Sequence, residues 1–351
     1  MKYRKLGTTD LDVSLICMGT MNFGEQNTES EGHEQMDYAL SQGINFIDTA
    51  ELYPIPPRGE SHGRTEIYIG NWLKKRKNRD SLTIASKVIG PSDFTYVRGD
   101  DKPTLLDGES IRKAVDGSLK RLQIDTIDLY QIHWPSRKTN YFGVRDFAYD
   151  QAHDKTAPSI EEILSTMKDL IKEGKIRYIG LSNETAWGVM EYLRLHRKKD
   201  LPRIQSIQNP YSLLMREYEN ALAEISIREK VSLLAYSPLA HGVLAGKYLD
   251  GAMPEKSRFA YSGGRNFERY NPAHAQTAIQ KYIDLAKKHG LDPAQMAISF
   301  VNDREFVTST IIGATTMQQL KADIGSIDLA LEDEVMTEIA QIHLEYPNPI
   351  T

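Results

Sequence analysis

The feature that most constrains the fold of this chain is a regular alternation of short β-rich runs with amphipathic stretches of helical period. Several runs are nearly continuous in apolar residues, as in the strands of a parallel sheet that is covered on both faces. Eight strands are the number that closes a parallel barrel with a helix after each strand. We expect strands at residues 14–20, 45–50, 82–88, 127–133, 176–183, 206–212, 232–238 and 309–314.

The stretches between these runs carry the signals of amphipathic helices. Ser159 followed by Glu162 forms a capping-box pattern, and Gly174 comes after the apolar face of the same stretch. Asp292 before Pro293 marks the start of another helix. The sequence therefore predicts an α/β fold, a (β/α)8 TIM barrel with an N-terminal β-hairpin, elaborated βα loops and a C-terminal extra helix.

The length of 351 residues would ordinarily suggest two domains, but no low-complexity linker divides this chain. A minimal barrel takes roughly 250 residues. The surplus falls in the hairpin at residues 1–14, in two connections at about 134–158 and 240–271, and in the C-terminal helix. Connections of this length in compact domains usually carry function. We expect a single domain over residues 1–351, enlarged around the mouth of the barrel.

Composition and charge exclude several classes of partner. With 43 Lys+Arg against 48 Asp+Glu the net charge is −5, so no global basic field predicts a nucleic-acid partner. Cys17 is the single cysteine, which excludes intrachain disulfides and a cysteine-based zinc cluster, and we expect no metal. The sequence has no run of roughly 18 apolar residues and no signal-peptide pattern, so we expect no membrane partner and a cytoplasmic location. The oligomeric state is left open.

Three consecutive predicted strands end on polar or charged side chains, which are Asp48, Lys87 and His133. Tyr53 follows five residues after Asp48, on the loop that leaves the second strand. Each has an ordinary alternative, since such residues also serve as helix caps, solvated charges or structural histidines. In a parallel barrel, however, all strand ends meet at one mouth, where catalytic groups lie. Charges gathered there are costly without a function, so we interpret the four residues as a candidate active site.

These four side chains together suit proton donation to a carbonyl oxygen. A free phenol has a pKa near 10, which makes it a weak acid at neutral pH. A Lys87 ammonium about 4 Å from Tyr53 would favour phenolate by up to roughly 4 kcal/mol at an effective dielectric constant near 20, before desolvation is counted. Asp48 can keep Lys87 charged, and His133 can donate a hydrogen bond to the substrate. We expect a small-molecule carbonyl substrate, and the chemistry lacks only a hydride.

Motifs spread over almost the whole chain resemble the aldo/keto reductase superfamily. They are FIDTAELY, ASKV, LYQIHWP, KIRYIGLSN, LLAYSPLAHGVLAGKY and IIGATTMQQL, in this order. The segments GEQN, AELYPIPPR, GNWL and IQNPYSLL are most similar to its bacterial Tas-type branch. The resemblance implies a barrel that binds NADPH in extended form across its mouth, without a Rossmann fingerprint. It also implies that Tyr53 is the general acid and that Lys87 modifies the pKa of Tyr53. Asp48 would then be the ion-pair partner of Lys87, and His133 would donate the hydrogen bond that orients the carbonyl.

The resemblance further implies where NADPH, or the NADP product, would bind. Gly19, Thr20 and Met21 would form a wall near the nicotinamide. Its carboxamide would be hydrogen-bonded by Ser182, Asn183 and Gln208, and Tyr236 would stack on its ring. The pyrophosphate would lie along Ser237, Pro238, Leu239, Gly242 and Leu244, with Lys247 nearby. The adenosine end would be held by Gly313, Thr315, Gln319 and Asp323.

Preference for NADPH over NADH requires a cation for the 2′-phosphate. Arg258 matches the family's arginine for this group, and Arg265 is a second candidate. A solvated charged loop is the ordinary alternative for both. Many relatives carry Glu-Asn after the motif that holds the predicted adenosine glutamine, where this chain has Ala322 and Asp323. Asp323 can accept a hydrogen bond from adenine but Ala322 cannot. The sequence therefore supports the four catalytic residues better than it supports the preference for NADPH.

Two other classes of function are open at this point. A cofactor-binding regulatory module, like the potassium-channel β subunits, shares this fold, but those subunits have asparagine where this chain has His133. An aldolase or isomerase would use Lys87 as a Schiff-base amine. That amine needs a depressed pKa, whereas Asp48 would keep Lys87 charged.

The substrate itself is not predicted beyond its class. An aromatic wall beside the site is expected from Trp134, Tyr141, Phe142 and Tyr346. Such a wall would favour apolar or aromatic carbonyls. The same rings could equally pack the loops against the barrel.

Overall fold

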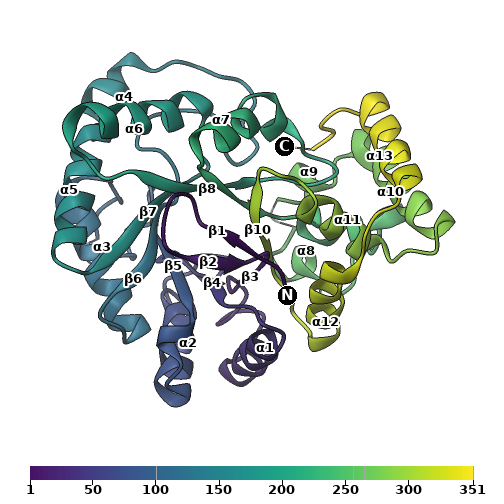
Figure 1. Cartoon of the computed structure of the whole chain (residues 1–351), viewed down its shortest axis with the longest axis horizontal. Helices are drawn as coiled ribbons and strands as arrows, with labels where there is room; N and C mark the ends of the chain where they lie inside the picture. Colours follow the sequence, from purple (N-terminus) through teal and green to yellow (C-terminus); the bar gives the residue numbers. More distant parts are fainter. Residues whose placement is uncertain (100, 256, 265, 351) are drawn as a thin grey trace.

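Eight parallel strands close into a barrel in the computed structural model, which describes residues 1–99, 101–255, 257–264 and 266–350 (Figure 1). Each strand pairs with its neighbour in the chain, and the last pairs with the first. The strands are β3 (Ile16–Gly19), β4 (Phe46–Asp48), β5 (Thr83–Val88), β6 (Ile127–Ile132), β7 (Ile176–Ser182), β8 (Ile204–Pro210), β9 (Ser232–Tyr236) and β10 (Val307–Ile312). The predicted (β/α)8 barrel is confirmed.

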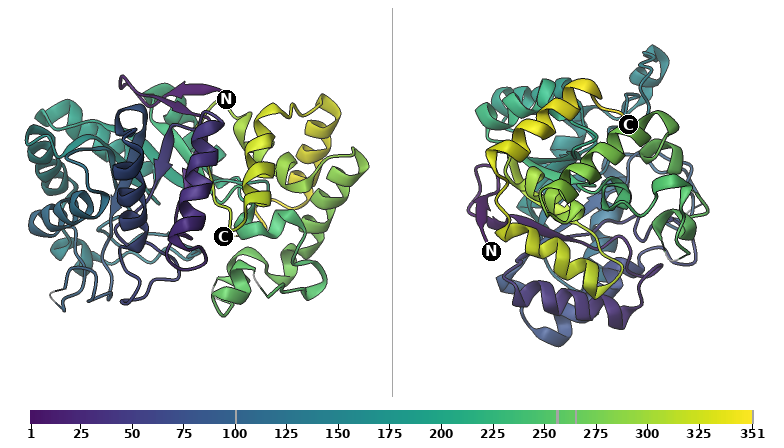
Figure 2. Two further views of the ribbon diagram at one scale, coloured as in Figure 1. Left: turned by 90° about the horizontal axis from the view of Figure 1, so that it is seen from below. Right: turned by 90° about the vertical axis from the view of Figure 1, so that its right-hand side faces the viewer.

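The outside of the barrel is covered by helices that follow the strands, as two further views show (Figure 2). They are α1 (Glu29–Ser41), α2 (Arg64–Arg76), α3 (Gly108–Leu122), α5 (Ile160–Lys172), α6 (Ala186–Lys199), α7 (Leu222–Glu229), α10 (Gln276–Lys288), α11 (Pro293–Asn302), α12 (Met317–Gly325) and the C-terminal α13 (Asp333–Glu345). Two predicted starts are confirmed, because Ser159 and Asp292 accept from backbone N–H groups at the beginnings of α5 and α11. Among the described residues, no helix combines the length and the apolar character needed to cross a bilayer.

The predicted strand ends differ from the observed ones by at most two residues. The difference has a physical reason, because the polar residues at these ends leave the hydrogen-bonded ladder. Asn183 and Ser237 come directly after β7 and β9 with φ angles of 53° and 55°. A positive φ breaks the extended backbone, so β7 and β9 end before these residues.

The N-terminal hairpin fills the end of the barrel opposite to this mouth. Its strands β1 (Tyr3–Lys5) and β2 (Asp12–Ser14) pair antiparallel, as predicted. Leu6 and Val13 of the hairpin are fully buried with apolar side chains from inside the barrel. The hairpin therefore closes the amino-terminal end of the parallel strands, and the polar strand ends lie at the other.

The two long connections contain short helices. The first holds α4 (Gln151–Thr156), and the second holds α8 (Arg258–Tyr261) and α9 (Phe267–Tyr270) among turns of 3-10 helix. Helices of four to six residues are too short to show a helical period in sequence. The sequence consequently predicts that these connections are elaborated, but not what they form.

Candidate active site

Lys87 is in direct contact with both Asp48 and Tyr53 at the mouth of the barrel. Lys87 Nζ donates to Asp48 Oδ2 at 2.6 Å and to Tyr53 Oη at 3.4 Å. Its third donor reaches the Thr49 carbonyl oxygen at 2.8 Å. All three side chains are buried, and Lys87 is completely inaccessible. The structure thus brings together three of the four predicted catalytic residues around one ammonium group.

Burial and the neighbouring charges act against each other on the pKa values in this cluster. Burial by itself would lower the pKa of Lys87, but the Asp48 carboxylate, together with Tyr53, outweighs it and raises that pKa above its ordinary value. For Tyr53, burial is the larger cause and raises the pKa of the phenol, while Lys87 lowers it only in part. The Lys87 charge favours the phenolate form of Tyr53, as expected from the sequence, but the effect of burial on the pKa is larger. Lys87 is therefore charged and Tyr53 is protonated at neutral pH.

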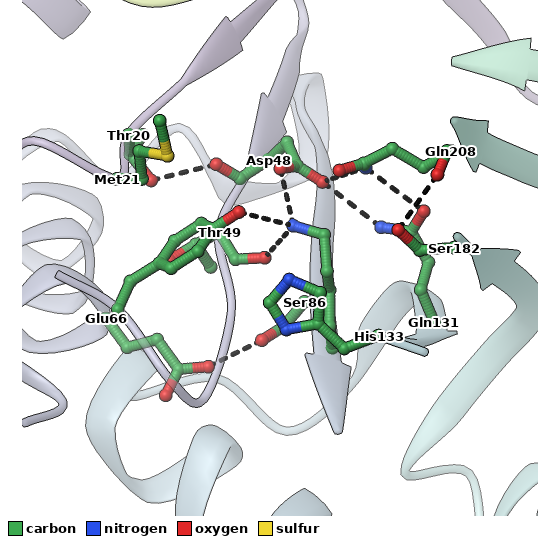
Figure 3. A network of polar contacts seen from close by, with 12 residues as sticks. Thr20, Met21, Asp48, Thr49, Glu66, Ser86, Gln131, His133, Ser182 and Gln208 are labelled. Atoms are coloured by element: carbon green, nitrogen blue, oxygen red, sulfur yellow. Dashed lines mark hydrogen bonds and ion pairs between the residues drawn. The ribbon is translucent and has the colours of Figure 1, made fainter. Parts of the chain in front are cut away.

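Two glutamines hold the other oxygen of Asp48 (Figure 3). Gln208 Nε2 donates to Asp48 Oδ1 at 2.8 Å, and Gln131 Nε2 donates to the same atom at 3.1 Å. Sequence reasoning assigned Gln208 to the cofactor and missed Gln131. Its position could have revealed it, because Gln131 pairs with Lys87 in the sheet and stands two residues before His133, on the same face of the chain.

His133 follows β6 and faces Tyr53 across the mouth. The two ring centroids are 5.7 Å apart and the planes meet edge-on at 78°. Burial, with the nearby Lys87, lowers the pKa of His133 well below its usual range, so the imidazole is neutral and keeps one N–H donor. Its Nδ1 is buried and has no hydrogen-bond partner in the described part of the chain. A neutral imidazole beside a phenol suits hydrogen bonding to an uncharged substrate oxygen.

The residues predicted for the nicotinamide carboxamide and ring form a hydrogen-bonded set on β7, β8 and β9. Asn183 Nδ2 donates to the His133 carbonyl oxygen at 2.8 Å, and Tyr236 Oη donates to Asn183 Oδ1 at 2.6 Å. Ser182 Oγ donates to the Gln208 carbonyl oxygen at 2.9 Å. Both polar atoms of the Asn183 side chain therefore have protein partners, which a carboxamide would have to share.

The predicted wall at the end of β3 is tightly built. A Cβ on Gly19 would lie 2.6 Å from the Ile312 carbonyl oxygen, so only glycine fits at this strand end. Thr20 Oγ1 donates to the Asp48 carbonyl oxygen at 2.8 Å, and Met21 follows it in the loop. These contacts place the wall directly beside the Asp48 and Lys87 pair.

The predicted pyrophosphate segment is a tight turn after β9. Ser237 opens it with a positive φ, and Pro238 is buried beneath it. The N–H groups of Gly242 and Leu244 both donate to the Leu239 carbonyl oxygen, at 2.8 and 3.2 Å. These two donors are satisfied within the turn, so charged side chains nearby are the better candidates for holding an anion.

Two such cations stand beside this turn. Lys247 Nζ lies over Gly242, where a Cβ would come within 2.8 Å of it. Arg258, at the start of α8, donates to Asn22 Oδ1 at 3.0 Å and to Met21 Sδ at 3.4 Å. Within the described residues, neither cation has a carboxylate ion-pair partner. Burial lowers the pKa of both, and repulsion from Arg258 adds to this for Lys247. The other predicted cation, Arg265, lies outside the described residues.

The residues predicted for the adenosine end lie after β10 and along α12. They are Gly313, Thr315, Gln319 and Asp323. Gln319 Oε1 accepts from the N–H and from the hydroxyl of Thr315, both at 3.0 Å. Burial, with repulsion from Asp292, raises the pKa of Asp323 to about 7, while Lys247 lowers it in part. Near neutral pH this carboxyl group can both accept and donate toward an adenine.

Asp323→Asn tests this shift through the pH dependence of stability. The folded state keeps a proton on Asp323 up to about pH 7, whereas the unfolded chain releases it near the ordinary value of 3.8. Between these values the folded state binds more protons, so wild-type stability falls as the pH rises. Relative to wild type, the free energy of unfolding of Asp323→Asn should rise by about 2–3 kcal/mol between about pH 5 and about pH 8.

Urea denaturation of the cofactor-free proteins at both pH values measures this difference. Asp328→Asn, at an exposed carboxylate just beyond α12, is the control and should follow the wild type. Parallel pH dependence in wild type and Asp323→Asn would show that the Asp323 carboxyl is not shifted.

Three of the four predicted wall aromatics gather beside His133. The ring centroid of Trp134 lies 5.1 Å from that of His133 and 5.5 Å from that of Phe142. The rings of Tyr141 and Phe142 are 5.2 Å apart. Tyr346 is an exception, because it ends α13 and packs beside Lys281, whose Nζ is 5.4 Å from its ring centroid. The three rings beside His133 all come from the loop after β6, and whether they contact a substrate or only pack this loop stays a prediction.

Comparisons with known proteins show which family this chain is similar to. The family model described as the aldo/keto reductase family matches residues 15–343. Protein tas from Escherichia coli strain K12 is 51% identical over 99% of this chain and 99% of its own length. The uncharacterized oxidoreductase YrpG from Bacillus subtilis strain 168 is 33% identical over 99% of this chain and 97% of its own length. Norsolorinic acid reductase B from Dothistroma septosporum is 27% identical over 99% of this chain and 82% of its own.

Proposed function

The chain belongs to the aldo/keto reductase family and is an oxidoreductase of that family, and from this premise we propose that it is an NADPH-dependent reductase of aldehydes or ketones. In this proposal, hydride transfer converts the carbonyl to an alcohol and Tyr53 is the general acid. The observation that carries the proposal is the contact of Tyr53 Oη with the charged Lys87, beside the neutral His133.

NADPH, when bound, supplies the hydride in this reaction. Tyr53 is protonated, and it donates its phenolic proton to the carbonyl oxygen as negative charge develops there. The phenolate that remains lies beside the Lys87 ammonium, which stabilises it more than the neutral phenol and so favours the transition state. His133 donates a hydrogen bond to the same oxygen. Asp48 keeps Lys87 charged and in place throughout.

The mouth suits a ligand that carries several negative charges. Arg258 and Lys247 are partly removed from water and form no salt bridge with the described residues, although the Asp323 carboxyl offsets part of the lowering of the Lys247 pKa. Cations in this situation are costly, and phosphate groups would offset the cost. Gly242 keeps space open beside Lys247, where a side chain would collide. The family generally uses NAD(P)H, and our choice of NADPH rests on Arg258 as the partner of the 2′-phosphate.

The raised pKa of Lys87 disfavours the aldolase alternative. A Schiff-base lysine must be neutral to attack a carbonyl, and Asp48 instead holds this amine in its charged form. As a further part of the proposal, the partner is a small carbonyl compound that binds against the rings of Trp134, Tyr141 and Phe142. No nucleic acid, membrane or metal takes part in the proposed function. The location is the cytoplasm, and residues 1–351 form one domain.

Cofactor titration with Arg258→Ala, together with turnover, tests the proposal. We expect wild-type protein to oxidise NADPH in the presence of a nitrobenzaldehyde. Arg258→Ala should weaken NADPH binding by about tenfold or more and NADH binding much less, because only NADPH carries the 2′-phosphate. Fluorescence titration gives the dissociation constants, and the absorbance of the reduced nicotinamide gives turnover.

Arg228→Ala, at an exposed arginine on α7, is the control for a lost surface charge. Binding of NADPH without turnover across aldehydes, ketones and quinones would contradict a reductase and favour the regulatory module. Equal losses for the two cofactors in Arg258→Ala would show that this arginine does not bind the 2′-phosphate, and its contacts with Met21 and Asn22 would then assign it to the part of the mouth beside the predicted nicotinamide wall.

A further inference from the structure

A buried ion pair lies directly behind Tyr53. Arg98 Nη2 donates to Glu51 Oε2 at 3.3 Å, and the two side chains are only 7% and 2% exposed. Glu51 stands two residues before Tyr53 on the loop that leaves β4, and Arg98 lies on the loop after β5. The proposed reaction uses neither charge directly.

Glu51 joins the Tyr53 loop to the strand end that carries Lys87. Its N–H donates to the Lys87 carbonyl oxygen at 3.1 Å, and its carboxylate accepts from the Ile89 N–H at 3.0 Å. The Tyr53 N–H then donates to the Ala50 carbonyl oxygen at 3.1 Å, which folds the intervening residues into a tight turn. The position of Glu51 therefore determines where the phenol stands relative to Lys87.

Arg98 adds the neighbouring loop to this arrangement. Val97, next to it in the chain, is buried in the same apolar cluster as Tyr53 and Trp134. Arg98 Nε is buried and unpaired among the described residues, so the Glu51 carboxylate is the contact that holds the guanidinium here. The ion pair consequently ties the apolar lining of the mouth to the loop of the general acid.

This pair is a poor device for stability alone. Burial raises the pKa of Glu51, and Arg98 and the Ile89 N–H offset that only in part. Replacing a buried ion pair with packed apolar residues is often neutral or stabilising. An ion pair differs from apolar packing in that it fixes direction and distance between two groups, which a loop carrying a catalytic residue requires.

We propose that Glu51 and Arg98 are positioning residues that keep Tyr53 Oη within reach of Lys87 Nζ. The inference rests on the proposed function, in which Tyr53 donates the proton. The 3.4 Å contact between the two groups is already long for a hydrogen bond, so a small movement of the loop breaks it. Loss of that contact removes the cation that stabilises the phenolate and slows proton donation, while the cofactor site is left intact.

Glu51→Gln and Arg98→Met test the pair from its two sides. Glutamine keeps the size of Glu51 and an acceptor for the Ile89 N–H but removes the charge. We expect each variant to lower kcat for nitrobenzaldehyde reduction by about 10- to 100-fold, as small misplacements of catalytic groups do. The solvent deuterium isotope effect on kcat should rise, and NADPH affinity should stay within about twofold. Arg98→Lys keeps a cation at Glu51 and should recover most of the rate, and it serves as the test if Glu51→Gln does not fold.

Asp128 offers a matched control. Its carboxylate is also buried, accepts from the Ile84 N–H at 2.8 Å and pairs with Arg79 at 2.7 Å and with Arg177 at 3.0 Å, but it lies at the start of β6, away from the mouth. Asp128→Asn should lower Tm yet keep the kcat and isotope effect of wild type. Equal kcat losses in Glu51→Gln and Asp128→Asn, or a loss explained by weaker NADPH binding, would overturn the proposal alone. A wild-type protein without turnover would overturn it together with the proposed function.

Discussion

Tyr53→Phe is expected to lower kcat for carbonyl reduction by about 10³-fold and to leave NADPH affinity within about twofold of wild type. Phenylalanine keeps the ring that packs in the apolar cluster with Val97 and Trp134, so only the hydroxyl is lost. The substrate oxygen then keeps the His133 donor but receives no proton as charge develops on it. Lys87 retains its ion pair with Asp48, so the fold is expected to change little.

Steady-state turnover with a nitrobenzaldehyde, measured beside fluorescence titration with NADPH, checks this result. Tyr130→Phe is the matched control, because Tyr130 is a buried tyrosine on β6 whose hydroxyl has no hydrogen-bond partner among the described residues. It should behave as wild type in both measurements. Wild-type turnover in Tyr53→Phe would exclude Tyr53 as the general acid, and lost NADPH affinity would show that the phenol instead holds the cofactor.

The strand-end residues of the site could be predicted from sequence because a parallel barrel has a simple geometry. Eight apolar runs with helices between them define the barrel, and chain order then places every strand end at one mouth. Asp48, Lys87 and His133 could therefore be grouped without knowing any distance. In the structure Lys87 contacts Asp48 and Tyr53, and the Tyr53 ring lies 5.7 Å from that of His133, while their roles in catalysis stay a prediction.

Partners that meet only through side-chain conformation could not be predicted in the same way. Gln131 reads in sequence as one residue of a buried strand, and only the structure shows its amide on Asp48. The Glu51–Arg98 pair joins two loops whose shape no local pattern specifies. The pKa of Tyr53 depends on how completely the surrounding residues bury its hydroxyl. The degree of burial cannot be derived from composition or from the spacing of residues in the sequence.

Lys87→Met has the second large expected effect, because one ammonium serves both the fold and the proposed chemistry. Methionine is similar in length but carries no charge, so Asp48 stays buried without a counter-ion. Removing one partner of a buried pair typically costs about 3–5 kcal/mol of the free energy of unfolding. The phenolate of Tyr53 also loses its stabilising cation, so kcat should fall by about 10²- to 10³-fold.

Adding Asp48→Asn to Lys87→Met separates these two losses. A neutral asparagine can still accept from Gln131 and Gln208 and leaves no buried charge, so the double variant should recover most of the lost stability. It restores no cation beside Tyr53, so kcat should remain at the level of Lys87→Met. Urea unfolding and nitrobenzaldehyde turnover on the complete cycle of single and double variants measure both quantities. If kcat recovered along with stability, Lys87 would act only by supporting the fold, and its proposed part in proton donation would be wrong.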